Sequence, residues 1–268
     1  MFINILQQPC IFLPLMLGIY LSYRILRLTD LTVDGSFVTG SAVFARLMVE
    51  NYSYCFSFFI AVLAGAMSGV IVSLIQRNNK VDSIVAGILA VLMLYSINMQ
   101  IMGRPNISLL QFDFSSIGFI IGMAVLISAV TVLILLHSRY GLYLRGFGIN
   151  YHLLNRIGKA PELCRVLGLA ISNALAAASG CLLSQLNGFS DINIGFGVAL
   201  TAIGSLMIGQ HLIKKIYNNK VFSPVIDIVS CFVGIFIYFF VLNLIVLLGI
   251  DPVNIKFDHK IILCKNKF

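Results

Sequence analysis

Long apolar runs recur along almost the whole chain, and short polar segments separate them. A run of roughly 18 residues or more is long enough to cross the ~30 Å hydrocarbon layer of a bilayer as a helix. Of the 268 residues, 59% are hydrophobic and only 10% are charged, whereas soluble domains are about 45–50% apolar and about 25% charged. A soluble fold of this size has too few polar side chains to cover its apolar surface. The sequence therefore predicts a protein that lies in a membrane.

Each run is expected to be a helix, because irregular backbone cannot face lipid. The predicted fold class is all-α: a polytopic transmembrane helical bundle with about eight membrane segments. It is expected to be one domain over residues 1–250, with one helix broken near residues 28–36. The apolar runs lie near residues 9–27, 37–48, 54–75, 83–101, 115–136, 166–186, 192–212 and 222–249.

Basic residues give the expected orientation. Three connections are rich in lysine and arginine and alternate with connections that have few of either; the basic ones are 76–82, 137–165 and 213–221. Since basic loops stay in the cytoplasm, these three are expected there, with the N-terminus outside a bacterial inner membrane. No stripe of basic and aromatic residues suggests nucleic acid as a partner, despite the net charge of +8. The histidines and cysteines lack metal-ligand spacing, and no metal site is expected.

Small residues mark candidate close contacts between helices. Gly65 with Gly69, and Gly118 with Gly122, form GxxxG patterns, and residues 173–180 are nearly all small on one side. Such residues let helix backbones approach closely in lipid. They predict a packed bundle and indicate little about chemistry.

Two carboxylates lie between the first two apolar runs. Asp30 and Asp34 are four residues apart, with Thr32 and Ser36 beside them. Ionisable groups at membrane depth are costly and are candidates for function, and unwound backbone is tolerated there where it lines a water-filled cavity. These four residues are therefore candidates for a translocation path. The alternative is an interfacial turn with solvated carboxylates, in which Asp34 caps the following helix; a cap can also border a cavity, so the two interpretations are compatible.

Two asparagines and an outer turn are further polar candidates. Asn98 and Asn173 lie in apolar runs and are candidates for the path; Asn173 is also expected to hydrogen-bond across helices. Arg104 and Asn106 flank Pro105, which disfavours helix at the residue before it. This segment is expected to be a turn outside the membrane, either an ordinary anchored turn or a gate or docking surface for a protein that delivers solute.

The long basic connection holds a short apolar face. Leu153, Leu154 and Ile157 share one side of a predicted helix that Asn150 is placed to cap. A helix of about one to two turns is not stable alone in water, so this face needs a surface to pack on. That surface is a partner protein, the chain's own helix ends or the surface of the lipid.

Four separated motifs resemble, in order, the signatures of one group of ABC permeases. They are Asp30–Phe37 (DLTVDGSF), Tyr95–Asn98 (YSIN), Met102–Ile107 (MGRPNI) and Gly188–Asn193 (GFSDIN). The group is the tryptophan/tyrosine type, which is related to the branched-chain amino acid and ribose permeases. The resemblance covers about residues 10–250.

The resemblance implies a helical permease in the lipid bilayer that forms a dimer, expected to be a homodimer, and binds two cytosolic ABC ATPase subunits. An extracytoplasmic substrate-binding protein would deliver a small amino acid or a related solute. The segment that matches Arg145–Gly158 would contain the coupling helix that docks in the ATPase. Its candidate residues are Arg145, Gly148, Asn150, Leu153, Leu154 and Ile157.

The chain itself is not expected to be an enzyme. It has no GxxxxGK(S/T) sequence, so ATP is expected to bind to the partner subunit and no cofactor to this chain. The alternative function is an ion-coupled secondary transporter that uses Asp30 and Asp34. Such transporters often have discontinuous helices in two matching halves, and no second copy of the Asp30–Ser36 stretch stands out.

Two stretches differ from the family pattern. Residues 145–150 are RGFGIN where the family usually has RATGDN, so Ile149 stands in place of an acid. Relatives continue after Asn254 with a final hydrophobic helix, whereas residues 251–268 are basic and too short to span. This basic tail is expected to replace a lost final helix.

Overall fold

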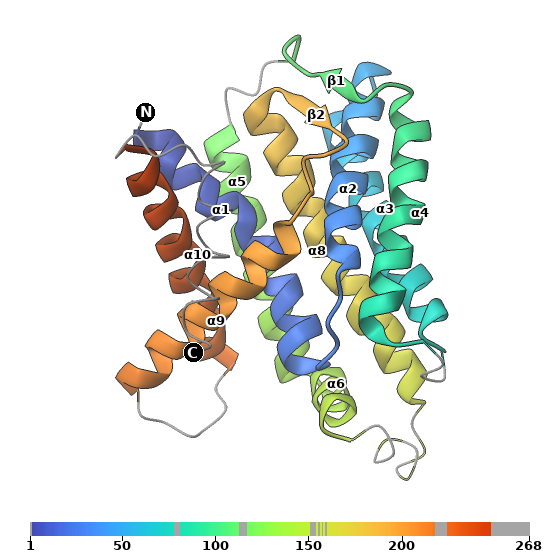
Figure 1. Ribbon diagram of the computed structural model, residues 1–268, viewed down its shortest axis with the longest axis vertical. Coiled ribbons are helices and arrows are strands. Elements are labelled where there is room, and N and C mark those ends of the chain that lie inside the picture. Colours follow the sequence, from blue (N-terminus) through green and yellow to red (C-terminus); the bar gives the residue numbers. More distant parts are fainter. Residues whose placement is uncertain are drawn as a thin grey trace, which may run out of the picture.

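The computed structural model describes residues 2–77, 81–112, 117–150, 154, 156, 158, 160–217 and 224–247, most of which are helical (Figure 1). The first part of the chain forms α1 (Phe2–Ile19), the π-helix η1 (Tyr20–Ile25), α2 (Thr32–Val49), α3 (Tyr54–Ile75), α4 (Ser83–Met102) and strand β1 (Asn106–Ser108). The second part forms α5 (Ile117–His137), α6 (Arg139–Ile149), α8 (Pro161–Asn187), strand β2 (Phe189–Asp191), α9 (Val198–Tyr217) and α10 (Pro224–Leu247). The basic tail 251–268 lies outside the described residues.

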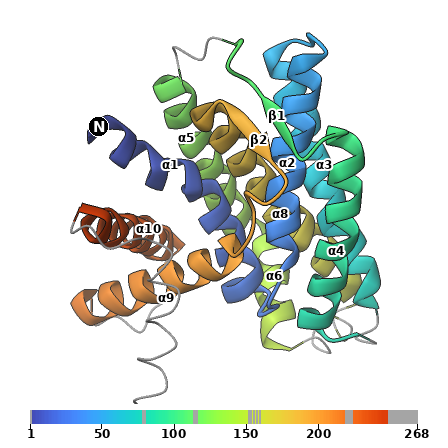
Figure 2. The same ribbon diagram turned by 45° about the horizontal axis from the view of Figure 1, so that its top comes forward.

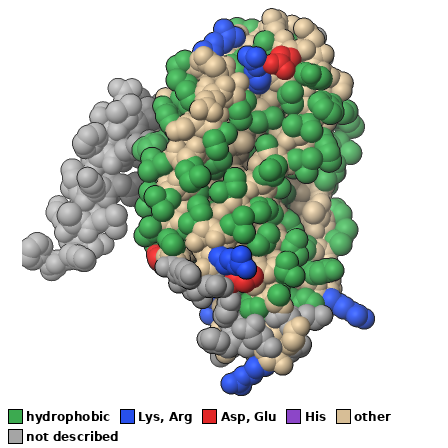
Figure 3. Space-filling model, turned by 90° about the vertical axis from the view of Figure 1, so that its right-hand side faces the viewer, with side chains coloured by type: hydrophobic (Ala, Val, Ile, Leu, Met, Phe, Trp, Pro, Cys, Tyr) green, Lys and Arg blue, Asp and Glu red, His purple; other side chains and the backbone are tan. Residues whose placement is uncertain are grey.

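The predicted all-α polytopic bundle is confirmed. Five described helices are long and apolar enough to cross a membrane, namely α3, α4, α5, α8 and α10. The count of about eight segments is not confirmed. Two of the other runs form α2 and α9, which carry more polar residues, such as Asp34 and Arg46 in α2 and Lys214 and Lys215 in α9. Figure 3 shows apolar side chains over the middle of one face and basic side chains near its two ends, an arrangement that suits a lipid layer.

Helix α8 lies at the centre of the bundle, and α1, α2 and α3 pack around it (Figure 2). In its most apolar stretch 61% of the residues are buried, against 22–33% for the other four candidate spans. A Cβ added at Gly65 or Gly69 of α3 would collide with the backbone of α8. Close packing through this GxxxG pair is therefore confirmed, whereas a Cβ at Gly122 of α5 would meet nothing within 4 Å.

The break between the first two runs is shorter than predicted. Helix α1 continues as η1 to Ile25, and α2 already begins at Thr32. The Asp30 carboxylate accepts a hydrogen bond from the Thr32 amide at 2.9 Å, which supports this early helix start. Asp34 and Ser36 therefore lie inside α2, and the suggestion that Asp34 caps this helix was wrong.

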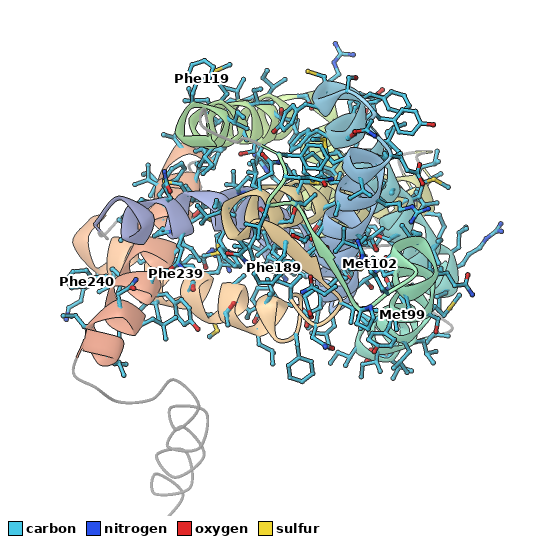
Figure 4. All side chains as sticks on the ribbon, turned by 90° about the horizontal axis from the view of Figure 1, so that it is seen from above. Met99, Met102, Phe119, Phe189, Phe239 and Phe240 are labelled. Carbon is cyan, nitrogen blue, oxygen red and sulfur yellow. The ribbon has the colours of Figure 1, made fainter. Side chains whose placement is uncertain are left out.

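Strands β1 and β2 form a small antiparallel sheet at one end of the bundle, at the top of Figure 1. Asn106 pairs with Asp191, and Ser108 pairs with Phe189. The sheet joins the connection after α4 to the connection after α8. Figure 4 looks down on this end, with Phe189 near the middle and Phe119 and Phe240 at the outer edge.

Helix α6 lies at the opposite end of the bundle (Figure 1). It occupies part of the segment that was expected to be a polar connection, and the Ser138 side chain caps it by accepting from the Gly141 amide at 3.4 Å. Asn150 is the residue that follows α6 at its C-terminal end. A Cβ at Gly141 would collide with the backbone of α5, and one at Gly148 with the Ile25 carbonyl. The glycines thus let α6 lie close against α5 and η1.

Candidate functional site

The Asp30 carboxylate is the buried charge at the start of α2. Only 3% of the residue is exposed. Its Oδ1 accepts from the Thr32 amide, and its Oδ2 accepts from Asn173 Nδ2 of α8 at 2.8 Å. A buried carboxylate needs such donors, because leaving it unpaired costs several kcal/mol, roughly. The bond to Asn173 joins the start of α2 to the central helix.

The same asparagine extends the contact into a polar network across three helices. Asn173 Oδ1 accepts from Ser36 Oγ of α2 at 2.5 Å, and Ser36 Oγ lies 2.5 Å from Ser68 Oγ of α3. Ser68 Oγ also lies 2.6 Å from the Gly65 carbonyl oxygen. We call Asp30, Asn173, Ser36 and Ser68 the α2–α3–α8 network. All four residues are buried, so the network fixes the relative position of these helices.

The second carboxylate, Asp34, faces a different helix. Its Oδ1 accepts from the Ala199 amide at 2.6 Å, and its Oδ2 accepts from the Gly197 amide at 3.2 Å. These amides lie at the start of α9, where the helix dipole favours a negative charge. Gly197 has φ 79°, which suits glycine, and allows the chain to turn into α9 here. Asp34 therefore caps α9 and ties α2 to it.

Thr32 and Asn98 leave polar atoms without partners. Asn98 Nδ2 donates to the Gly35 carbonyl at 3.3 Å. Within the described ranges, Thr32 Oγ1 and Asn98 Oδ1 are buried and have no hydrogen-bond partner. A buried polar oxygen of this kind is available to a water molecule or to a solute.

The structure brings the six path candidates together around the first half of α2. Asp30, Ser36 and Asn173 belong to the α2–α3–α8 network. Asp34 and Asn98 bond on either side of that helix segment, and Thr32 opens it. The expected hydrogen bond of Asn173 across helices is confirmed.

The outer-turn candidates lie on the sheet end of the bundle. Arg104 is exposed, and the turn after α4 leads directly into β1. Asn106 Nδ2 donates to Asp191 Oδ2 at 3.3 Å across the strand pair. The Pro105 carbonyl accepts from the Ile192 amide at 3.0 Å, so this turn is joined to the segment that leads to α9.

The coupling candidates lie at the α6 end. Arg145 Nη2 donates to the Leu136 carbonyl at the end of α5, at 2.9 Å. Gly148 faces η1, and Asn150 is exposed. Leu154 is 1% exposed and packs in the main core, so for this residue the surface that covers the apolar face is the chain itself. Leu153 and Ile157 lie outside the described residues.

Two buried polar contacts were missed in the sequence. Arg165 of α8 is 1% exposed; it donates to the Gln76 carbonyl after α3, lies 3.4 Å from Glu162, and has its guanidinium carbon 5.6 Å from the centre of the Phe147 ring of α6. The Tyr20 hydroxyl of η1 donates to Asp227 Oδ2 of α10 at 2.9 Å. In the sequence, Arg165 stands at the end of the basic connection 137–165, and its spacing of three from Glu162 is the signal for this contact.

Comparison with known proteins identifies the kind of molecule. Residues 1–256 match the family model described as branched-chain amino acid transport system / permease component. The chain is 47% identical to an uncharacterized protein of Rickettsia prowazekii (strain Madrid E), over 97% of this chain and 94% of that protein. It is 32% identical to the tyrosine transport system permease protein of Clostridioides difficile (strain R20291), over 97% of this chain and 88% of that protein. No solved structure matches significantly.

These matches confirm the resemblance drawn from the four motifs. They also agree with the apolar helices in making the chain a multi-pass protein of the inner membrane, and they make it a transport subunit and not an enzyme. The chain therefore belongs to the family of permease components of branched-chain amino acid transport systems, a family of ABC permeases.

Proposed function

We propose that this chain is the membrane-spanning subunit of an ATP-driven importer for an amino acid or a related small solute. The observation that carries the proposal is the family match over residues 1–256, together with a relative named for tyrosine transport. The solute would pass beside the first half of α2, where Thr32 Oγ1 and Asn98 Oδ1 are buried and unpartnered within the described part of the chain. The α2–α3–α8 network would hold the helices that border this path.

The two ends of the bundle suit different partners. A cytosolic ABC ATPase would bind at the α6 end, where Tyr140 and Ile149 are 63% and 72% exposed. An extracytoplasmic binding protein would dock on the sheet end, beside the exposed Arg104 and Asn106. Two copies of the permease would complete the transporter, and about eight segments would span the bilayer with the N-terminus outside.

The environment of the carboxylates favours this function over ion-coupled transport. Asp30 and Asp34 accept hydrogen bonds from amide N–H groups, namely those of Thr32, Asn173, Gly197 and Ala199. A site for a hard cation is instead made of converging oxygen ligands. Both carboxylates thus serve as hydrogen-bond acceptors between helices.

Reconstitution tests the source of energy. The permease is purified with its co-purifying ATPase and placed in liposomes, and uptake of radiolabelled tyrosine and branched-chain amino acids is measured from a binding-protein solution. We expect uptake to require ATP and to persist when ionophores collapse the sodium and pH gradients. Uptake by liposomes that hold this chain alone, driven by either gradient, would overturn the proposal.

The docking surface has its own test. Tyr140→Asp places a charge on the exposed face of α6, where Tyr140 is 63% exposed, and is expected to abolish co-purification of the ATPase. Leu110→Asp is the matched control, because Leu110 is 81% exposed next to β1 at the other end of the molecule. Equal recovery of the ATPase with both variants would contradict docking at α6.

A further inference from the structure

Among the described residues, Arg165 is the largest side chain that is almost fully buried, and its surroundings are specific. A buried guanidinium is stable only where its charge and its donors are satisfied. Here Nη1 donates to the Gln76 carbonyl, Nη2 lies 3.4 Å from Glu162 Oε1, and the guanidinium lies over the Phe147 ring. The Gln76 carbonyl follows the last turn of α3, where the helix dipole favours a positive charge. One side chain of α8 thus contacts both α3 and α6.

These contacts lie at the base of the proposed coupling segment. Phe147 belongs to the last turn of α6, and Arg165 belongs to the second turn of α8. The chain between them contains the segment that would dock in the ATPase. The contact between the Arg165 guanidinium and the Phe147 ring therefore joins the two ends of this segment where they meet the bundle. The hydrogen bond from Arg165 to the Gln76 carbonyl connects these two ends to α3.

Helix α8 connects this base to the α2–α3–α8 network. Arg165 and Asn173 belong to the same continuous helix. Eight residues of α-helix span about 12 Å. Asn173 bonds to Asp30, just before α2, and to Ser36 inside α2. A displacement of Phe147 and Arg165 would therefore be transmitted along α8 to α2, the helix that borders the proposed path.

We propose that Arg165 is a positioning residue that couples the ATPase-docking segment to α3 and α8. The inference rests on the proposed function, because it assumes that an ATPase moves this segment. The proposed role of Arg165 depends on its planar guanidinium group. An ammonium group keeps the charge but is a compact, strongly hydrated ion that cannot stack on the ring and donate from a rigid fork at the same time.

The test measures solute transported per ATP hydrolysed by the reconstituted permease–ATPase complex. Phe147→Leu keeps an apolar side chain but removes the ring, and Arg165→Lys keeps the charge but removes the fork. We expect both complexes to assemble and hydrolyse ATP, with transport per ATP reduced by up to about 30-fold, the factor that corresponds to a desolvated cation–π contact of about 2 kcal/mol. Phe147→Tyr keeps an aromatic ring and is expected to retain the transport per ATP of the unsubstituted complex.

A second variant separates coupling from stability. Phe44 is also buried and has its ring against Tyr54, with centroids 5.7 Å apart, far from Arg165 in the sequence. Phe44→Leu is expected to lower the melting temperature but to leave transport per ATP unchanged. If Phe147→Leu behaves in the same way, or if Phe147→Tyr fails to retain transport per ATP, Arg165 is only structural. Failure of ATP-driven transport by the unsubstituted complex would instead refute the proposed function.

Discussion

Asn173 uses both ends of its side-chain amide. Its nitrogen donates to Asp30 and its oxygen accepts from Ser36, and the residue is fully buried. An isosteric Asp at position 173 has no N–H group to donate, and its carboxylate would face that of Asp30. Ala at this position would remove the donor and leave the Asp30 carboxylate with the hydrogen bond from the Thr32 amide. The amide is therefore the side chain that suits both neighbours.

Replacing Asn173 is expected to destabilise the bundle. We expect Asn173→Ala to lower the free energy of unfolding by about 1–3 kcal/mol, because a buried acceptor loses its donor, and Asn173→Asp to be worse. Thermal unfolding in detergent measures the change. Asn243→Ala is the matched control, since the hydrogen bond that Asn243 makes within the described part of the chain lies inside its own helix, to the Phe239 carbonyl. A drop of the same size in the control would show that the network contributes nothing particular.

Among the elements, α3 and α8 depend on glycine for their contact. A Cβ at Gly65 would meet the Asn173 carbonyl oxygen at 2.8 Å and the Ala177 side chain still closer. The neighbouring contact at Gly69 is with the Leu169 carbonyl. The two helices thus lie close enough for Ser68 of α3 to reach Ser36 of α2 beside the central helix.

Alanine at these glycines is expected to push the helices apart. We expect Gly65→Ala or Gly69→Ala to cost about 1–3 kcal/mol through overpacking. Gly122→Ala in α5 tests the same change where a Cβ meets nothing within 4 Å, and it is expected to cost nothing. Melting curves of the three variants decide the matter. Equal stability of Gly65→Ala and Gly122→Ala would contradict the close approach.

Much of this element structure follows from the sequence, and the rest depends on tertiary contacts. Apolar runs predicted the helices because lipid leaves the backbone few alternatives. Helix α6 was missed because Gly141, Gly146 and Gly148 disfavour helix in isolation, whereas packing of Gly141 and Gly148 on α5 and η1 stabilises it. Strands β1 and β2 are three residues each, too short to show an alternating pattern.

The candidate site was predicted as separate residues and not as a network. Asp30 is a candidate because it is an ionisable group between two apolar runs, and Asn173 because it is a polar residue within one. Their bond joins residues 143 apart in the chain, and no local pattern encodes such a pairing. The same holds for Arg165 and Gln76, which are 89 apart. The sequence therefore indicated which groups needed partners but not which partners they would find.

At the scale of the whole molecule, the sheet end and the α6 end lie on opposite sides of an apolar bundle (Figure 1). Arg139 and Arg145 belong to α6, and Arg165 lies beside it. The distribution of basic residues predicts that this end lies in the cytoplasm and that the opposite end faces outward.

Cysteine labelling in intact cells tests this orientation. We expect Leu110→Cys to react with a membrane-impermeant maleimide added outside, because Leu110 is 81% exposed at the sheet end. Ile149→Cys, with 72% exposure in the original residue, is expected to react only after the cells are opened. The unsubstituted chain gives the background from its native cysteines. The reverse labelling pattern would invert the proposed topology.

The β1–β2 pairing limits how the helices can move. Its hydrogen bonds fasten the outer ends of α4 and α8 to each other through short connections. A helix as long as α8 extends about 40 Å. If the β1–β2 pairing holds one end of α8, a small tilt of the helix displaces that end little and displaces the opposite end most. We therefore expect the sheet ends of α4 and α8 to move least, and their opposite ends to move most, when force is applied at the α6 end.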